Sequence, residues 1–318
     1  MRSGAYSDVF KVWLYVGASV LTGAWVSPFI YNAGKALAEV SAEKQTNGVL
    51  AWLADVCRTA DFPRFFAVSL LSCAGIFFLP FILSLRGRKG GQHLQVNPRG
   101  PYQAVAGFLL VTLLFLLIAA VLVQASVIGW KNPKESFAKM LLGGLAGAFG
   151  LAVFQEILFR GIAMGIFLRA MRPSAALGIS AVLFALVHFL NPVNGVHVFD
   201  PDAGGVGFEL LRKIAARFAD PPAIFGMFTP LLALGGVLAY ARWRTASLWL
   251  PIGLHGGWIF VNGILASVTV ASSSPDSIMW MFAGASLKQG MVPLLAILLA
   301  GVLTRYLTSP DDTADTPA

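Results

Sequence analysis

Charge is scarce in this sequence: only 12% of its 318 residues are Asp, Glu, Lys or Arg, while 57% are hydrophobic. Soluble domains carry about twice that share of charged residues, so these values exclude an ordinary soluble domain. The mean hydropathy of +0.74 agrees with this. The composition therefore predicts a protein that crosses a membrane several times.

Cysteine is also rare, since only Cys57 and Cys73 are present. Two such residues exclude a disulfide framework and a thiolate metal site. The net charge is +8, but its basic residues fall in short groups between apolar segments, such as 86–89 and 242–244. Membrane topology explains these groups better than nucleic-acid binding does, so no nucleic-acid partner is expected.

Long apolar runs dominate what remains. A membrane-spanning helix needs about 20 apolar residues, and eight stretches approach this length: 10–31, 63–85, 103–126, 137–160, 174–190, 221–240, 247–268 and 289–307. The fourth stretch is expected to continue as a helix to about residue 171, because the first breaker after it is Arg172-Pro173. The predicted fold is an all-α, polytopic transmembrane bundle of about eight helices.

The sequence also predicts the structure of three segments that lie between or after these apolar stretches. The VLAWLADV part of 35–62 is expected to form a short amphipathic helix in the membrane interface. The loop 191–220 is interpreted as a connector or a lid. The polar, acidic tail 308–318 is expected to be disordered.

Few ionisable residues lie at membrane depth, and these are Glu156, Arg160, His188 and His255. Such residues are rare inside a membrane unless they have a partner or a function. Glu156 and Arg160 are four residues apart, so they share one helical face and can form an ion pair. Arg160 is therefore expected to have a structural role beside Glu156.

The helical hairpin around Arg172 predicts that Glu156 and His188 meet. Each lies 16 positions from Arg172 in the sequence, which is about 24 Å along a helix. The two side chains should thus lie at similar depth. Together with His255 they have the chemistry to hold a water and remove its proton, or alternatively to bind a divalent metal such as zinc through two imidazoles and one carboxylate.

Three short motifs follow one another on separate predicted helices. They are Gln155-Glu156 with Arg160, in the form EExxxR; Phe184 with His188, in the form FxxxH; and His255 at the start of an HxxxN-like motif. This ordered set resembles the CPBP family of intramembrane proteases, which includes the type II CAAX prenyl endopeptidases. The resemblance covers about residues 140–262.

The resemblance implies roles for these positions. The first acidic residue and the FxxxH histidine would activate water, and the HxxxN histidine and asparagine would stabilise the oxyanion. Here Gln155 stands in place of the first glutamate and Ile259 in place of the asparagine. A glutamine amide cannot serve as a general base. Glu156 is the next carboxylate, and Asn262, on nearly the same helical face as His255, is the nearest asparagine.

The leading hypothesis is an intramembrane endopeptidase that cleaves membrane-associated peptides or proteins, with Glu156 and His188 activating water and His255 stabilising the oxyanion. Catalysis without a cofactor is expected, with the zinc site Glu156, His188 and His255 as the alternative. Other hypotheses are a pseudoprotease that binds peptides without cleaving them and a proton-coupled transporter.

The expected domain organisation has three parts: N-terminal transmembrane helices in 1–136, a CPBP-like catalytic core in 137–307 and the tail 308–318. The expected location is a bacterial inner (plasma) membrane, in which the chain is a multi-pass protein. Its partners would then be the lipid bilayer and a peptide or membrane-protein substrate.

Overall fold

The computed structural model describes residues 2–44, 47–85, 96–133, 136–191, 198, 200–271 and 287–308. Almost all of these residues are helical, and the strands among them form one two-stranded ribbon. The helices divide into two compact units, 1–88 with 189–220 and 89–188 with 221–318. The all-α bundle predicted from the sequence is confirmed. The tail beyond residue 308 lies outside the described residues.

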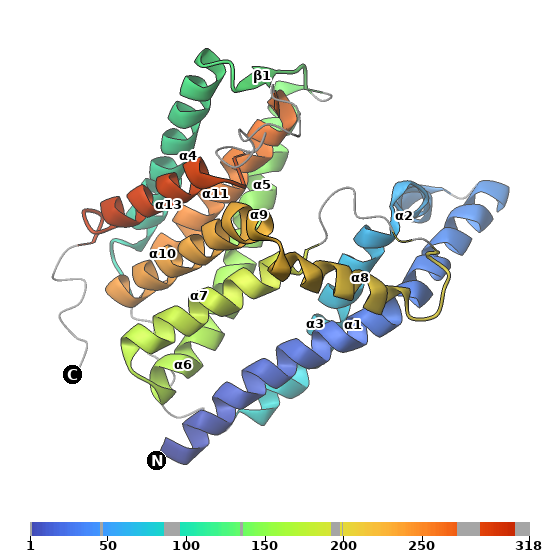
Figure 1. Cartoon of the computed structure of the whole chain (residues 1–318), viewed down its shortest axis with the longest axis horizontal. Coiled ribbons are helices and arrows are strands. Elements are labelled where there is room, and N and C mark those ends of the chain that lie inside the picture. The colour runs from blue at the N-terminus through green and yellow to red at the C-terminus, as the bar shows by residue number, and fades with distance from the viewer. Residues whose placement is uncertain are drawn as a thin grey trace. The chain divides into compact units, whose positions relative to one another are not determined.

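The first unit is built on α1, a long helix that packs against α3 and the shorter α2 (Figure 1). Asp61 caps α3 by accepting a hydrogen bond from the backbone N–H of Arg64 at 3.2 Å. The Lys35 ammonium donates to the carbonyls of Cys57, Arg58 and Ala60, which lie at the end of α2. The helices of this unit are α1 (Arg2–Lys44), α2 (Gly48–Thr59), α3 (Phe62–Ser84), α8 (Val206–Ala216) and η2 (Arg217–Ala219).

The helix α8 lies in the stretch 191–220 that the sequence suggested was a connector or a lid. Its buried residues Val206, Leu210 and Ile214 recur every four positions and pack toward α1. Gly207 permits close approach, since a Cβ there would lie 1.9 Å from the carbonyl oxygen of Ala24. The stretch therefore contains an amphipathic helix, as does the VLAWLADV segment, which forms most of α2.

The second unit is a helical bundle around α11, which packs against α4, α5 and α10. The ribbon pairs β1 with β2 in antiparallel register, Gly129 opposite Val270. The elements are α4 (Gly100–Gln124), β1 (Ile128–Trp130), α5 (Phe137–Glu156), η1 (Ile157–Ala163), α6 (Met164–Ala170), α7 (Pro173–Phe189), α9 (Pro221–Ala223), η3 (Ile224–Phe228), α10 (Thr229–Thr245), α11 (Trp249–Val268), β2 (Thr269–Ala271) and α13 (Met291–Thr304).

Six helical stretches in the described parts of the chain are long and apolar enough to cross a membrane, and α7 and α13 are shorter apolar helices. These eight correspond to the eight stretches found in the sequence. On α4, Leu113, Leu117 and Val121 form an exposed stripe along one face. Such a stripe suits contact with lipid, where apolar side chains need no cover. The chain is an integral membrane protein.

Close contact between α4 and α11 depends on two glycines one turn apart, Gly253 and Gly257. A Cβ on Gly253 would lie 2.1 Å from the carbonyl oxygen of Ala104, and one on Gly257 would lie 2.6 Å from that of Phe108. Small residues four positions apart let membrane helices approach each other closely. This packing fixes the position of α11, which carries His255.

We expect Gly253→Ala to destabilise the protein, because the new methyl group must displace the α4 backbone. Overpacking of this kind costs about 1–3 kcal/mol. Gly263→Ala is the matched control on the same helix, since nothing lies within 4 Å of a Cβ there and alanine favours a helix over glycine by about 1 kcal/mol. Thermal unfolding in detergent should show a lower Tm for Gly253→Ala than for Gly263→Ala, and equal midpoints would contradict the packing argument.

Candidate active site

Glu156 is the last residue of α5 and lies directly before the π-helical segment η1. Its side chain is fully buried, and its Oε1 accepts a hydrogen bond from Arg160 Nη1 at 3.1 Å. A π-helical turn inserts an extra residue into the helical repeat and is frequent at functional sites. The predicted ion pair is present, and the helix continues to Ala170 as expected.

Arg160 connects the carboxylate to a neighbouring helix. Its Nη2 donates to the carbonyl oxygen of Gly235 on α10 at 3.1 Å, and its guanidinium lies 4.4 Å from the centre of the Phe184 ring. A buried charge needs both a counter-charge and hydrogen-bond partners. Arg160 therefore stabilises the negative charge of Glu156 and anchors η1 to α10.

His255 is held against Glu156 by the packing of α11. Residues 253 and 257 face α4, and residue 255 lies two positions from each, about 200° around the helix. His255 consequently points away from α4, and its Nδ1 lies 2.6 Å from Glu156 Oε1 with both side chains fully buried. A carboxylate can only accept, so His255 Nδ1–H is the donor. The other ring nitrogen, Nε2, has no hydrogen-bond partner among the described residues.

His188 lies near the end of α7 and is only partly buried. Its Nδ1 is 2.8 Å from the carbonyl oxygen of Phe184 one turn earlier, and the Phe184 ring stacks on the imidazole with 4.0 Å between centroids. A carbonyl oxygen accepts a hydrogen bond, which assigns the proton to Nδ1 and leaves a lone pair on Nε2. The two imidazoles are 6.3 Å apart between ring centroids.

The structure thus brings together Glu156, Arg160, His188 and His255, although the contacts differ from those expected. Glu156 Oε1 bonds Arg160 and His255, and Oε2 has no partner in the described part of the chain. The expected contact between Glu156 and His188 is replaced by one between Glu156 and His255. The hairpin itself turns at 171–172, as the sequence predicts.

Gln155 and Ile259, the two residues that depart from the family motifs, both lie in described helices. Gln155 is partly buried, and its Oε1 lacks a hydrogen-bond partner among the described residues. Ile259 is partly buried as well. Asn262 is fully buried, and its Nδ2 donates to the carbonyl of Trp258 at 2.9 Å, which leaves Oδ1 without a partner among the described residues.

Several other buried polar atoms of this region have no partner in the described residues. They are Glu156 Oε2, Arg160 Nε, His255 Nε2 and Trp258 Nε1. Such atoms are uncommon in folded proteins, and each requires an explanation such as a bound water or a catalytic role. Their gathering around one carboxylate and one imidazole suits a site that binds water or a polar group of a substrate.

The zinc alternative requires Glu156, His188 and His255 to converge as ligands. Within the described ranges, no group of three or more His, Cys, Asp or Glu side chains is arranged to hold a metal ion. The zinc alternative therefore has no assembled ligand set among the described residues.

These features define a class of protein: a polytopic α-helical membrane protein with a carboxylate, an arginine and two histidines gathered between its helices. Residues 137–261 match the family model described as "Type II CAAX prenyl endopeptidase Rce1-like". This confirms the resemblance to the CPBP family over that segment, and the family implies protease activity. Comparisons with curated proteins and with solved structures gave no match.

Some residues of the site were not identified from the sequence. Gly253 and Gly257 form a small-xxx-small pattern that flags close helix packing, and this signal is visible in the sequence. Gly235 accepts from Arg160 through its backbone carbonyl, and Trp258 carries an indole N–H that has no partner among the described residues. No sequence pattern marks those two positions.

We expect Arg160→Lys to lower the yield of folded protein at least as much as any activity. A lysine ammonium cannot reproduce the planar, two-sided contact with Glu156 and the Gly235 carbonyl, so a buried charge loses partners. Size-exclusion chromatography in detergent would measure the folded fraction. Arg172→Lys, at an exposed position in the hairpin turn, is the control. Full yield for Arg160→Lys with complete loss of turnover would contradict a structural role.

Proposed function

We propose that this protein is an intramembrane endopeptidase that hydrolyses peptide bonds of membrane-associated substrates. The main support is the buried hydrogen bond between Glu156 Oε1 and His255 Nδ1, which is 2.6 Å long. Both residues lie in the segment that matches a protease family. A carboxylate that accepts from Nδ1–H orients a histidine ring, and the proposed reaction uses His255 as an imidazolium, with a proton on both ring nitrogens. Such an imidazole can donate its Nε2–H to a developing negative charge.

His188 is the proposed proton acceptor. The carbonyl of Phe184 fixes the Nδ1–H tautomer, so the lone pair of Nε2 is available for a proton from water. From the sequence, Glu156 and His188 were expected to share this task. Because both contacts of Glu156 go to Arg160 and His255, we now assign Glu156 to holding His255.

The reaction follows from these assignments. Water attacks the carbonyl carbon while His188 Nε2 accepts its proton, and the oxyanion that forms receives a hydrogen bond from His255 Nε2–H. The C–N bond then breaks, and the leaving amine takes the proton from His188. The products are a carboxylic acid and an amine, and no other reactant is consumed.

The proposal extends the functional core to residues 137–307, since α13 closes the bundle beside α10 and α4. It also implies two partners, the lipid bilayer and a peptide that reaches the buried site.

The alternative function is that of a pseudoprotease, which binds peptides without cleaving them. Gln155 favours this alternative, because no carboxylate stands at that position of the motif.

We expect His188→Ala to reduce cleavage of a quenched fluorescent transmembrane peptide by about 10²–10⁴-fold, the usual contribution of a positioned base. Glu156→Gln should also lower the rate, because the amide keeps the hydrogen-bond acceptor but removes the negative charge beside His255 and Arg160. Arg172→Lys serves as the control for handling in detergent. Initial rates with purified protein in proteoliposomes test this, and an unchanged rate for His188→Ala would exclude His188 as the proton acceptor.

Gln155→Glu should raise the rate of the same reaction, since it restores a carboxylate next to the site. The double change Gln155→Glu with Ile259→Asn should exceed either single change, because an oxyanion donor typically contributes about 10²–10³-fold. A rapid reaction in the unmodified protein that Gln155→Glu leaves unchanged would show that Gln155 is no defect. If no variant cleaves any reporter, the pseudoprotease function replaces the endopeptidase.

A further inference from the structure

The indole N–H of Trp258 is a buried donor without a use in the fold. The atom Nε1 is inaccessible to solvent and has no hydrogen-bond partner in the part of the chain that the structure describes. An indole nitrogen can donate but cannot accept. A buried donor that is left unpaired destabilises the folded state. The presence of such a donor therefore points to an acceptor that comes from outside the chain.

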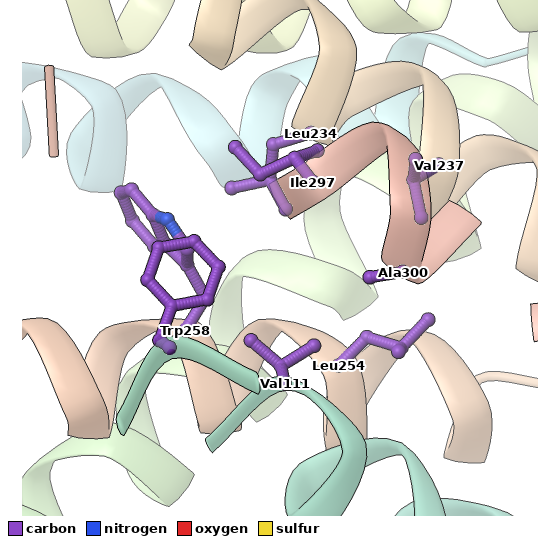
Figure 2. A pocket seen from close by; sticks show the side chains of 8 residues that line it. Val111, Leu234, Val237, Leu254, Trp258, Ile297 and Ala300 are labelled. Carbon is purple, nitrogen blue, oxygen red and sulfur yellow. The ribbon is translucent and has the colours of Figure 1, made fainter. Parts of the chain in front are cut away.

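The other side chains that line the pocket at Trp258 offer no such acceptor. The indole lines an apolar pocket together with Val111 of α4, Leu234 of α10, Leu254 of α11 and Ile297 of α13 (Figure 2). Apart from Trp258 itself, none of the side chains that line this pocket has a polar atom. The hydrocarbon walls keep water from competing for the N–H, and a hydrogen bond in such an environment is stronger than one in water.

Trp258 also lies beside the reactive imidazole. It is three residues after His255 on α11, and residues three apart are neighbours on a helix surface. The two rings are 6.2 Å apart between centroids. His255 Nε2 and Trp258 Nε1 are thus two nitrogens, one turn apart on α11, that have no partner among the described residues. A tetrahedral oxyanion is usually stabilised by two donors.

We propose that the Trp258 indole N–H is a second oxyanion donor, which acts together with His255. This inference rests on the endopeptidase function proposed above. Ile259, the next residue, has no polar side-chain atom, and the one donor group of the Asn262 side chain is bonded to the carbonyl of Trp258. Trp258 therefore supplies the donor that α11 otherwise lacks near His255.

Replacement of Trp258 by phenylalanine removes the N–H and keeps an aromatic ring in the pocket. In the transmembrane-peptide assay, kcat should fall by about 10²–10³-fold with KM unchanged, because an oxyanion exists only in the transition state. Trp249→Phe, at a partly exposed position at the start of the same helix, should retain the rate. A rise in KM alone would overturn the proposal, since it would place the N–H on the ground-state substrate.

Two further variants distinguish a loss of folding from a loss of the hydrogen-bond donor. If Trp258→Phe fails to fold, benzothienylalanine introduced at position 258 has the shape of tryptophan without the N–H and should show the same loss. Adding Ile259→Asn to Trp258→Phe should recover at least tenfold of the rate. An isosteric replacement with an unchanged kcat would exclude the N–H as an oxyanion donor.

Binding of a phosphinic peptide, which mimics the tetrahedral intermediate, distinguishes failure of this inference from failure of the proposed function. The unmodified protein should bind the phosphinate more tightly than the matching amide peptide, and Trp258→Phe should remove most of that difference. If the unmodified protein shows no preference and no cleavage, the endopeptidase function and the donor role both fail. If the preference is present and survives Trp258→Phe, only the donor role fails.

Discussion

The shared hydrogen bonding of Glu156 is the interaction on which the second unit depends. One carboxylate oxygen accepts from both Arg160 and His255, and Arg160 in turn donates to the Gly235 carbonyl, so η1, α10 and α11 are joined at one point. An uncompensated charge at this depth would be very unfavourable. The cluster therefore specifies how these helices pack, and any change in one member affects all of them.

Apolar packing makes this polar cluster possible. The close approach of α4 and α11 at Gly253 and Gly257 orients His255 toward α5. Phe184 contributes through several contacts at once: its ring lies on Arg160 and His188, and its carbonyl fixes the His188 tautomer. The contact between His255 and Glu156 therefore depends on tight packing of the bundle, because a small displacement of α11 would separate the two side chains.

Gln155 and Glu156 are neighbours in the paired motif, but their side chains have different environments. In a regular helix successive side chains point about 100° apart. The motif alone placed Gln155 at the position of the family's first glutamate, and Glu156 was expected to activate water with His188. With η1 starting directly after Glu156, this carboxylate is the one buried against Arg160 and His255. The structure therefore pairs Glu156, and not Gln155, with His255, which the spacing of the motif alone does not reveal.

The all-α membrane fold, the positions of eight apolar helices and the turn at Arg172 could be predicted from the sequence, because hydrophobic length and helix breakers are readable along one chain. The rarity of ionisable residues at membrane depth also identified Glu156, Arg160, His188 and His255 as candidate site residues. The sequence did not reveal that Glu156 pairs with His255, that Gly235 accepts from Arg160, or that the Trp258 N–H has no partner among the described residues. Those facts depend on helix rotation and on backbone atoms from distant segments, which only tertiary packing decides.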